Sequence, residues 1–129
     1  MKRLALVSGV VGLLAGCGAD LSDPRTQALL QLPSQQHYAE RQMAIELSAR
    51  CNRYSYDQKL ADAMSEARRN AGQPNAIQVR EGSALEAGVK RRTLSARYGA
   101  DRGALDACAT LDAETSLGSP FTVLAKPTG

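Results

Sequence analysis

Three cysteines and one histidine are the side chains with the widest chemical range in this sequence: Cys17, Cys51, Cys108 and His37. Thiolates and imidazoles bind transition metals, but zinc sites bring their ligands at close spacings such as CxxC or HxxxH, and neither spacing occurs here. We therefore expect no metal site. The chain also has no G-x-S-x-G nucleophile motif to act with His37, which we expect at the surface.

Pairs of carboxylates are the second group of side chains that could act in catalysis. Asp57 with Asp62, and Asp112 with Glu114, could act as the general acid and base of a glycan-cleaving enzyme. Two residues that are two positions apart on a helix point to different sides, so Asp112 and Glu114 should not converge. The sequence also lacks a GxxxxGK loop, a GxGxxG motif and a calcium-binding loop. These observations favour a protein that is not an enzyme.

Basic residues cluster in the second half of the chain. Six of them would form a patch if their helices aligned: Arg68, Arg69, Lys90, Arg91, Arg92 and Arg97. Such a patch could contact lipid head groups or an anionic envelope polymer. The alternative that we favour is a solvated face balanced by Glu66, Glu81 and Glu86, because no Trp or Tyr is interleaved to stack on sugars or bases.

The N-terminal segment has the layout of an export signal. Lys2 and Arg3 precede an uncharged, largely apolar run over residues 4–14. A run of about 11 residues is too short to span a bilayer, which takes roughly 20, and is typical of a signal peptide. Loss of Lys2 and Arg3 with the signal would lower the formal net charge from +3 to +1. A nearly neutral domain gives no reason to expect a nucleic acid as partner.

The residues that end this run, Leu14-Ala15-Gly16-Cys17, resemble the bacterial lipobox at all four positions. The resemblance implies a bacterial lipoprotein: residues 1–16 are removed, and the thiol of Cys17 carries a diacylglyceryl group as a thioether. Added acyl chains such as palmitate would give stable membrane attachment. Gly18 follows the cysteine instead of the Asp that resembles an inner-membrane retention signal, so we expect the outer membrane, with the protein facing the periplasm.

With Cys17 assigned to lipid, Cys51 and Cys108 remain as an even pair in an oxidising compartment, where a disulfide is the default. It would close a loop of about 58 residues, and the chain-entropy model gives on the order of 4 kcal/mol of stabilisation for such a loop.

The composition fits one domain of 129 residues, with 43% hydrophobic and 22% charged residues. Apolar periodicity predicts an all-α fold: a small bundle of about four helices with one interhelical disulfide and a short apolar C-terminal tail. The first predicted helix is 34–54, with an inward face made of Ala39, Met43, Leu47, Cys51 and Tyr54, and the second is 56–71, begun by a Ser55–Gln58 capping box. The third, 76–98, is broken, with Ile77 in a separate first turn and Leu85, Val89 and Ala96 inward. The last is capped by Asp101 and ended by Gly118. Residues 17–33 would be a lipidated tether with a short helix from Pro24, and 34–129 the helical domain. We expect no strand in the tail.

Two segments, AIELSARC and CATLDAETSLGSPFTVL, also resemble a family of small exported alphaproteobacterial proteins that is classed as a domain of unknown function. The middle of the chain, with Gly82-Ser83-Ala84 and Lys90-Arg91-Arg92, does not share the pattern. The resemblance implies a compact helical domain with one disulfide, and it brings no catalytic residues.

Together these features predict a membrane-anchored envelope protein with a non-enzymatic binding or structural role and no cofactor besides the lipid on Cys17. Its partners would be the membrane and an envelope protein or anionic envelope polymer. The alternative is a small envelope hydrolase or hydrolase inhibitor. A concave pocket with converging acidic or histidine side chains would favour the hydrolase.

Overall fold

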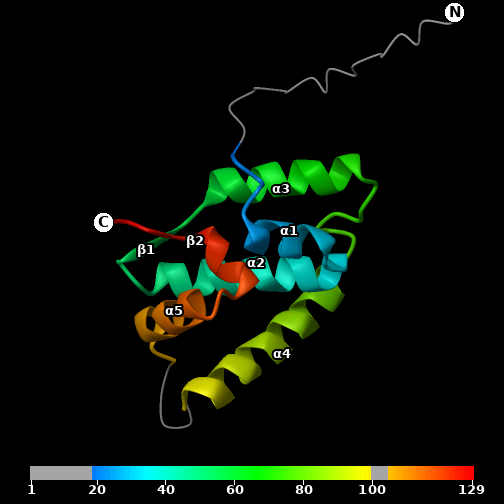
Figure 1. Ribbon diagram of the computed structural model, residues 1–129. Helices are drawn as coiled ribbons and strands as arrows, with labels where there is room; N and C mark the ends of the chain where they lie inside the picture. Colours follow the sequence, from blue (N-terminus) through cyan, green and yellow to red (C-terminus); the bar gives the residue numbers. More distant parts are fainter. Residues whose placement is uncertain (1–18, 100–104) are drawn as a thin grey trace, which may run out of the picture.

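The computed structural model describes residues 19–99 and 105–129 (Figure 1). The predicted signal peptide, the lipid attachment residue Cys17 and the predicted helix cap Asp101 lie outside these ranges. No helix in the described ranges is both long and apolar enough to cross a membrane.

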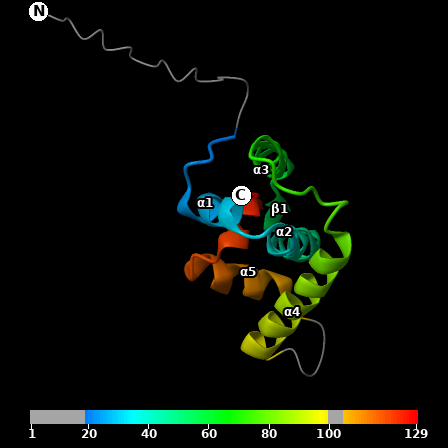
Figure 2. The ribbon, with the colours of Figure 1, turned by 90° about the vertical axis from the view of Figure 1, so that its right-hand side faces the viewer.

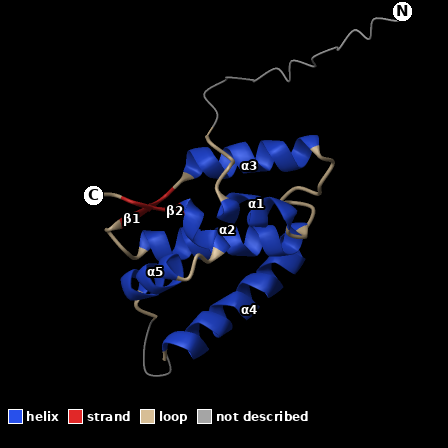
Figure 3. Ribbon diagram, in the orientation of Figure 1, coloured by secondary structure: helices blue, strands red, loops and turns tan. Residues whose placement is uncertain are grey.

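Most of the described chain is helical, as Figure 3 shows. The α-helices are α1 (Pro24–Gln31), α2 (Ser34–Ala49), α3 (Gln58–Asn70), α4 (Arg80–Tyr98) and α5 (Ala107–Ser116). A short 3-10 helix, η2 (Pro120–Leu124), and two strands, β1 (Tyr54–Tyr56) and β2 (Ala125–Pro127), complete the described elements. The described part therefore has five α-helices where we predicted about four, and it is not strictly all-α.

Helix α1 and the turn that joins it to α2, here called the α1–α2 corner, follow directly from local sequence. Asp23 caps α1 by accepting a hydrogen bond from the backbone N–H of Arg25, and Pro24 occupies a first-turn position that needs no N–H. Leu32 is extended because Pro33 follows it, so α1 ends there and α2 starts at Ser34. The predicted short helix from Pro24 is confirmed.

Helix α2 is the central element: α4, α5, β1 and η2 pack against it, whereas α3 packs mainly on α1 and η2. Ala39, Met43 and Leu47 are buried on one side of it, as predicted, together with Ala44. In Figures 1 and 2, α1 and α3 lie on one side of α2, and α4 and α5 lie on the other. Phe121 of η2 is fully buried in the same core, so the short tail packs back onto the helices.

The expected absence of a strand in the tail is wrong. α2 ends at Ala49 instead of 54, and Tyr54–Tyr56 forms β1, which pairs antiparallel with β2. The backbone N–H of Asp57 also donates to the Leu124 carbonyl at 2.8 Å. Strands this short carry no periodic signal, and the partners lie far apart in sequence, so only the tertiary fold brings them together. The cap of α3 is Asp57, which accepts from Leu60 N–H, and not the predicted Ser55.

Residues 76–79 form a separate turn that contains Ile77, as the predicted break implies, and α4 is then continuous from Arg80 to Tyr98. Its buried residues are Ala87 and Leu94. The predicted inward residues Leu85 and Val89 are 75% and 48% exposed. The contact with α2 is close: a Cβ at Gly82 would lie 2.5 Å from Cγ of Gln35. The small residues Gly82 and Ala87 are therefore on the inward side of α4, whereas Leu85 and Val89 point outward and Leu94 is the large apolar residue that is buried.

The predicted inward residue Ala96 is also exposed on α4. The last helix, α5, begins at Ala107, later than predicted. Its cap is Asp106, which accepts a hydrogen bond from Ala109 N–H.

Candidate functional site

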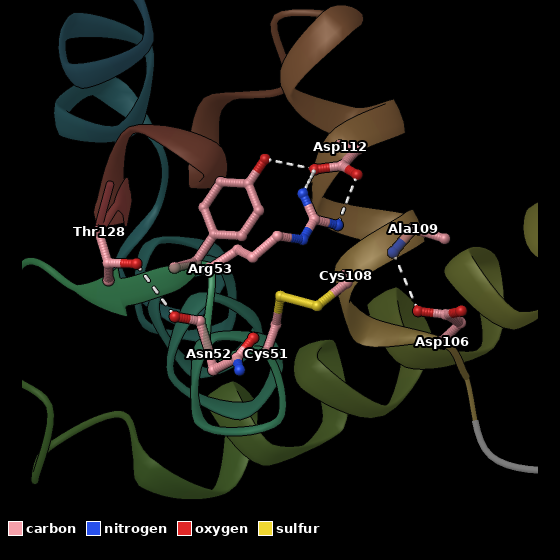
Figure 4. The surroundings of a disulfide bond; sticks show 9 residues. Cys51, Asn52, Arg53, Asp106, Cys108, Ala109, Asp112 and Thr128 are labelled. Atoms are coloured by element: carbon pink, nitrogen blue, oxygen red, sulfur yellow. Dashed lines mark hydrogen bonds and ion pairs between the residues drawn. A yellow bond between two sulfur atoms is a disulfide. The ribbon is translucent and has the colours of Figure 1, made fainter.

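The two cysteines of the predicted disulfide are joined. Cys51 and Cys108 have Cα atoms 5.1 Å apart, and Cys51 is only 3% exposed. Cys51 follows the C-terminus of α2, and Cys108 lies in the first turn of α5 (Figure 4). The predicted packing of these two helices against each other is confirmed.

An exposed ion pair lies beside the disulfide (Figure 4). Both terminal nitrogens of Arg53 donate to the Asp112 carboxylate, at 3.0 and 2.8 Å, and the Tyr54 hydroxyl donates to the same group at 2.7 Å. The hydrogen bonds from Arg53 and Tyr54 hold the pKa of Asp112 below its ordinary value. Asp112 is therefore charged and engaged, which does not suit a general acid.

Glu114 is fully buried and accepts hydrogen bonds from three side chains. Arg97 Nη1 lies 2.7 Å from one carboxylate oxygen and 2.9 Å from the other, and the hydroxyls of Tyr98 and Ser119 lie at 3.1 and 3.0 Å. These hydrogen bonds link the end of α4 and the start of η2 to α5. As expected from their spacing, Glu114 and Asp112 serve separate clusters.

His37 lies in the interior, so the prediction of a surface histidine is wrong. Its Nδ1 is 2.8 Å from the Leu29 carbonyl oxygen, which can only accept, so Nδ1 carries a proton. Burial lowers the pKa of His37 to about 4, and the positive charges of Arg68 and Arg41 act in the same direction. The imidazole is neutral at pH 7 and bridges the α1–α2 corner.

Of the six basic residues weighed as a possible patch, four make contacts within the protein. Arg68 is only 3% exposed and donates to the carbonyls of Leu30 and Leu32 and to the Ser34 hydroxyl, at 2.8 to 2.9 Å. Three other members form ion pairs: Lys90 with Glu40, Arg91 with Glu46 and Arg97 with Glu114. These are not the predicted partners Glu66, Glu81 and Glu86.

A concavity lies between α2 and α4. We call it the arginine groove. Its volume is about 520 Å³. The lining residues are Tyr38, Arg41, Gln42, Ile45, Ala76, Arg80, Ser83, Ala84, Ala87 and Arg91. The sequence analysis missed this site because its arginines come from two helices whose relative placement no local pattern reveals.

Arg41 is held in a defined position in the arginine groove. Its Nε donates to the Tyr56 hydroxyl at 3.2 Å, its Nη1 donates to the Ser65 hydroxyl at 2.7 Å, and its guanidinium carbon lies 5.3 Å from the centre of the Tyr38 ring. Two hydroxyls and an aromatic ring thus orient this cation without neutralising it.

A smaller pocket of about 220 Å³ lies where α2 and α4 also meet and includes Glu40, Glu86 and Lys90. Burial raises the pKa of Glu40, and the Lys90 ammonium at 3.4 Å opposes that rise. Glu40 is therefore paired with a cation from the facing helix. Within the described ranges, no group of three or more His, Cys, Asp or Glu residues is placed to hold a metal ion.

Comparisons of this chain with protein-family models, curated proteins and solved structures found no match. The assignment of a function therefore depends on the residues and geometry described above.

Proposed function

We propose that this chain is a bacterial envelope lipoprotein, anchored by lipid on Cys17, whose helical domain has a non-enzymatic binding or structural role. In this proposal the helices form a small bundle around α2, and the protein faces the periplasm from the outer membrane. We also propose kinship with the small exported alphaproteobacterial family that the sequence resembles.

The observation that carries the proposal is the position of Cys17 in the sequence Leu14-Ala15-Gly16-Cys17, directly after the short apolar run. The Cys51–Cys108 disulfide supports it, because such bonds persist in oxidising compartments outside the cytosol. Acyl chains on Cys17 would hold the protein firmly, since two or more chains exceed the marginal affinity of one.

The fold supports close attachment to a membrane. Residues 18–23 alone separate Cys17 from α1, and an extended chain of that length reaches about 20 Å. The domain would therefore stay near the lipid surface and bind partners there.

The side chains of the arginine groove favour binding over hydrolysis, and in the smaller pocket, which includes Glu40 and Glu86, Glu40 is paired with Lys90. Arginines line the larger groove, and its described lining includes no Asp, Glu or His. The four acidic residues considered for catalysis are used elsewhere: Asp57 caps α3, Asp62 accepts a hydrogen bond from the Gln58 amide, and Asp112 and Glu114 form ion pairs. A hydrolase would need an acid and a base that converge on one substrate bond.

The experiment that tests the proposal is replacement of Cys17 in the full chain, expressed in a bacterium fed labelled palmitate. Cys17→Ser should abolish the label and leave the unprocessed precursor, because the thiol is the acceptor of the lipid. The matched control is the double variant Cys51→Ala and Cys108→Ala, which should keep the label.

Processing of Cys17→Ser to the wild-type size would overturn the lipoprotein assignment. Separation of the two membranes should place the wild-type protein in the outer one. Recovery in the inner membrane would contradict that location while leaving the lipid attachment in place.

A further inference from the structure

The arginine groove combines cations with an apolar floor. Arg41, Arg80 and Arg91 contribute three guanidinium groups, while Ile45 and Ala87 lie among the apolar lining residues. A site of this composition suits a ligand that has both an anionic and an apolar part, because each part finds its complement.

The positive charge of the arginine groove is only partly compensated. Glu46 binds Arg91 through two hydrogen bonds of 3.1 and 2.7 Å. Within residues 19–99 and 105–129, neither Arg41 nor Arg80 forms an ion pair with a carboxylate. Arg41, which its hydrogen bonds orient, and Arg80 thus both line the groove without a counter-ion from the described protein.

The backbone of α4 adds to the positive electrostatic potential of the arginine groove. Arg80 and Ser83 belong to the first turns of this 19-residue helix, whose N-cap residue Val79 makes no side-chain capping hydrogen bond. The positive end of the helix dipole therefore lies beside Arg80, at the same end of the groove.

The volume of the groove favours a small molecule over a macromolecule as the ligand. Its volume of about 520 Å³ falls within the range of small-molecule sites, which is roughly 300 to 1,000 Å³. A macromolecular partner would need a far larger buried area.

We propose that the arginine groove binds a small molecule in which a phosphate or carboxylate is attached to a compact apolar group. The anionic group would bind Arg41 and Arg80, and the apolar group would contact Ile45, Ala84 and Ala87. This inference rests on the binding role proposed above and gives that role a ligand class. It does not depend on lipid at Cys17.

The test uses the full chain in a neutral detergent and isothermal titration calorimetry. The probes are 1-naphthyl phosphate and 1-naphthoate, with inorganic phosphate and 1-naphthol as the separate halves. We expect at least one naphthyl anion to bind at a single site, about tenfold or more tighter than either half. The naphthyl anion that binds with the higher affinity shows whether the groove prefers a phosphate or a carboxylate.

The variants separate the groove from general attraction to positive charge. Arg41→Gln combined with Arg80→Gln should weaken binding about tenfold or more. The matched control, Arg69→Gln combined with Arg92→Gln, removes the same charge from exposed positions outside the groove and should leave binding unchanged.

A second variant guards against loss of folding in the arginine variants. Ala84 is exposed on α4, where Glu is a good helix former, so Ala84→Glu should fold and place a competing carboxylate in the groove. It should abolish binding. No binding by the wild type, equal weakening in both double variants, equal affinity for inorganic phosphate, or wild-type affinity in Ala84→Glu would each overturn the proposal.

These results are independent of the acylation test. A chain that binds the probe without acylation would refute the lipoprotein proposal alone. A chain that is acylated but binds no probe would refute the ligand class alone.

Discussion

The imidazole of His37 is enclosed at the α1–α2 corner, where protonation would place a positive charge near Arg68 and Arg41. The pKa of His37 is about 4 in the folded protein against 6.5 as the ordinary value. The unfolded chain therefore takes up a proton below about pH 6.5 that the folded chain accepts only near pH 4. Stability is full above pH 6.5 and falls as the pH drops toward 4.

We predict that this effect is worth up to about 3 kcal/mol between pH 7 and pH 4.5. Urea unfolding of the wild type and of His37→Gln at both pH values measures it, because Gln cannot titrate but can still donate to the Leu29 carbonyl. Comparison of the two proteins cancels the contribution of carboxylates such as Glu40. An equal loss of stability in both proteins would show that His37 does not titrate as described.

Arg68 is the second buried ionisable side chain of this corner, and it satisfies two carbonyls near the end of α1. Arg68→Met should lower the free energy of unfolding by about 2 to 4 kcal/mol, because those carbonyls lose charged donors in the interior. Arg69→Met, at the exposed neighbouring position, should change it by about 0.5 kcal/mol or less. Equal effects of the two substitutions in chemical denaturation would refute the structural role of Arg68.

His37 and Arg68 also show why residue types alone misplace side chains. Both are polar, so the periodicity of apolar residues predicts that they lie at the surface. The same periodicity correctly predicted that Ala39, Met43 and Leu47 are buried. Their burial depends on carbonyls of α1 that α2 and α3 reach only after folding. No pattern within α2 or α3 contains that information.

At the scale of elements, local signals predicted most helix positions. Asp23 with Pro24, and Pro33, set the limits of α1, and Gly99, with a φ of 66°, ends α4 where predicted. The orientation of α4 was not predictable in this way. Its apolar residues are few, and the close approach at Gly82 decides which face meets α2.

The disulfide joins the end of α2 to α5, and its removal should lower the stability of the whole domain. Cys51→Ala or Cys108→Ala should lower the free energy of unfolding by roughly 2 to 5 kcal/mol, because the unfolded chain is no longer cross-linked. The double variant should lose about as much as either single one, since one bond is lost in each case. Thermal or urea unfolding measures all three.

Reducing agent supplies the control for the disulfide. It should destabilise the wild type to the level of the double variant and leave the double variant unchanged. Additive losses in the two single variants would contradict the cross-link.

At the scale of the whole molecule, the described part of the chain is a small disulfide-linked helical domain, and its first helix begins shortly after Cys17, the cysteine of the proposed export signal. Lys90, Arg91 and Arg97 form ion pairs, whereas Arg41 and Arg80 of the arginine groove have no carboxylate partner among the described residues. A domain held near a membrane by a short tether would present that groove to small anionic molecules at the surface.

The intact mass of the mature full-length product, extracted from membranes without reduction and treated with an alkylating reagent, tests the lipid anchor and the disulfide together. We predict a chain that starts at Cys17, carries the added mass of a diacylglyceryl group and acyl chains, and takes up no alkylating reagent, because Cys51 and Cys108 are joined. An unacylated chain starting at another residue would contradict the lipid anchor, and two alkylated cysteines would contradict the disulfide.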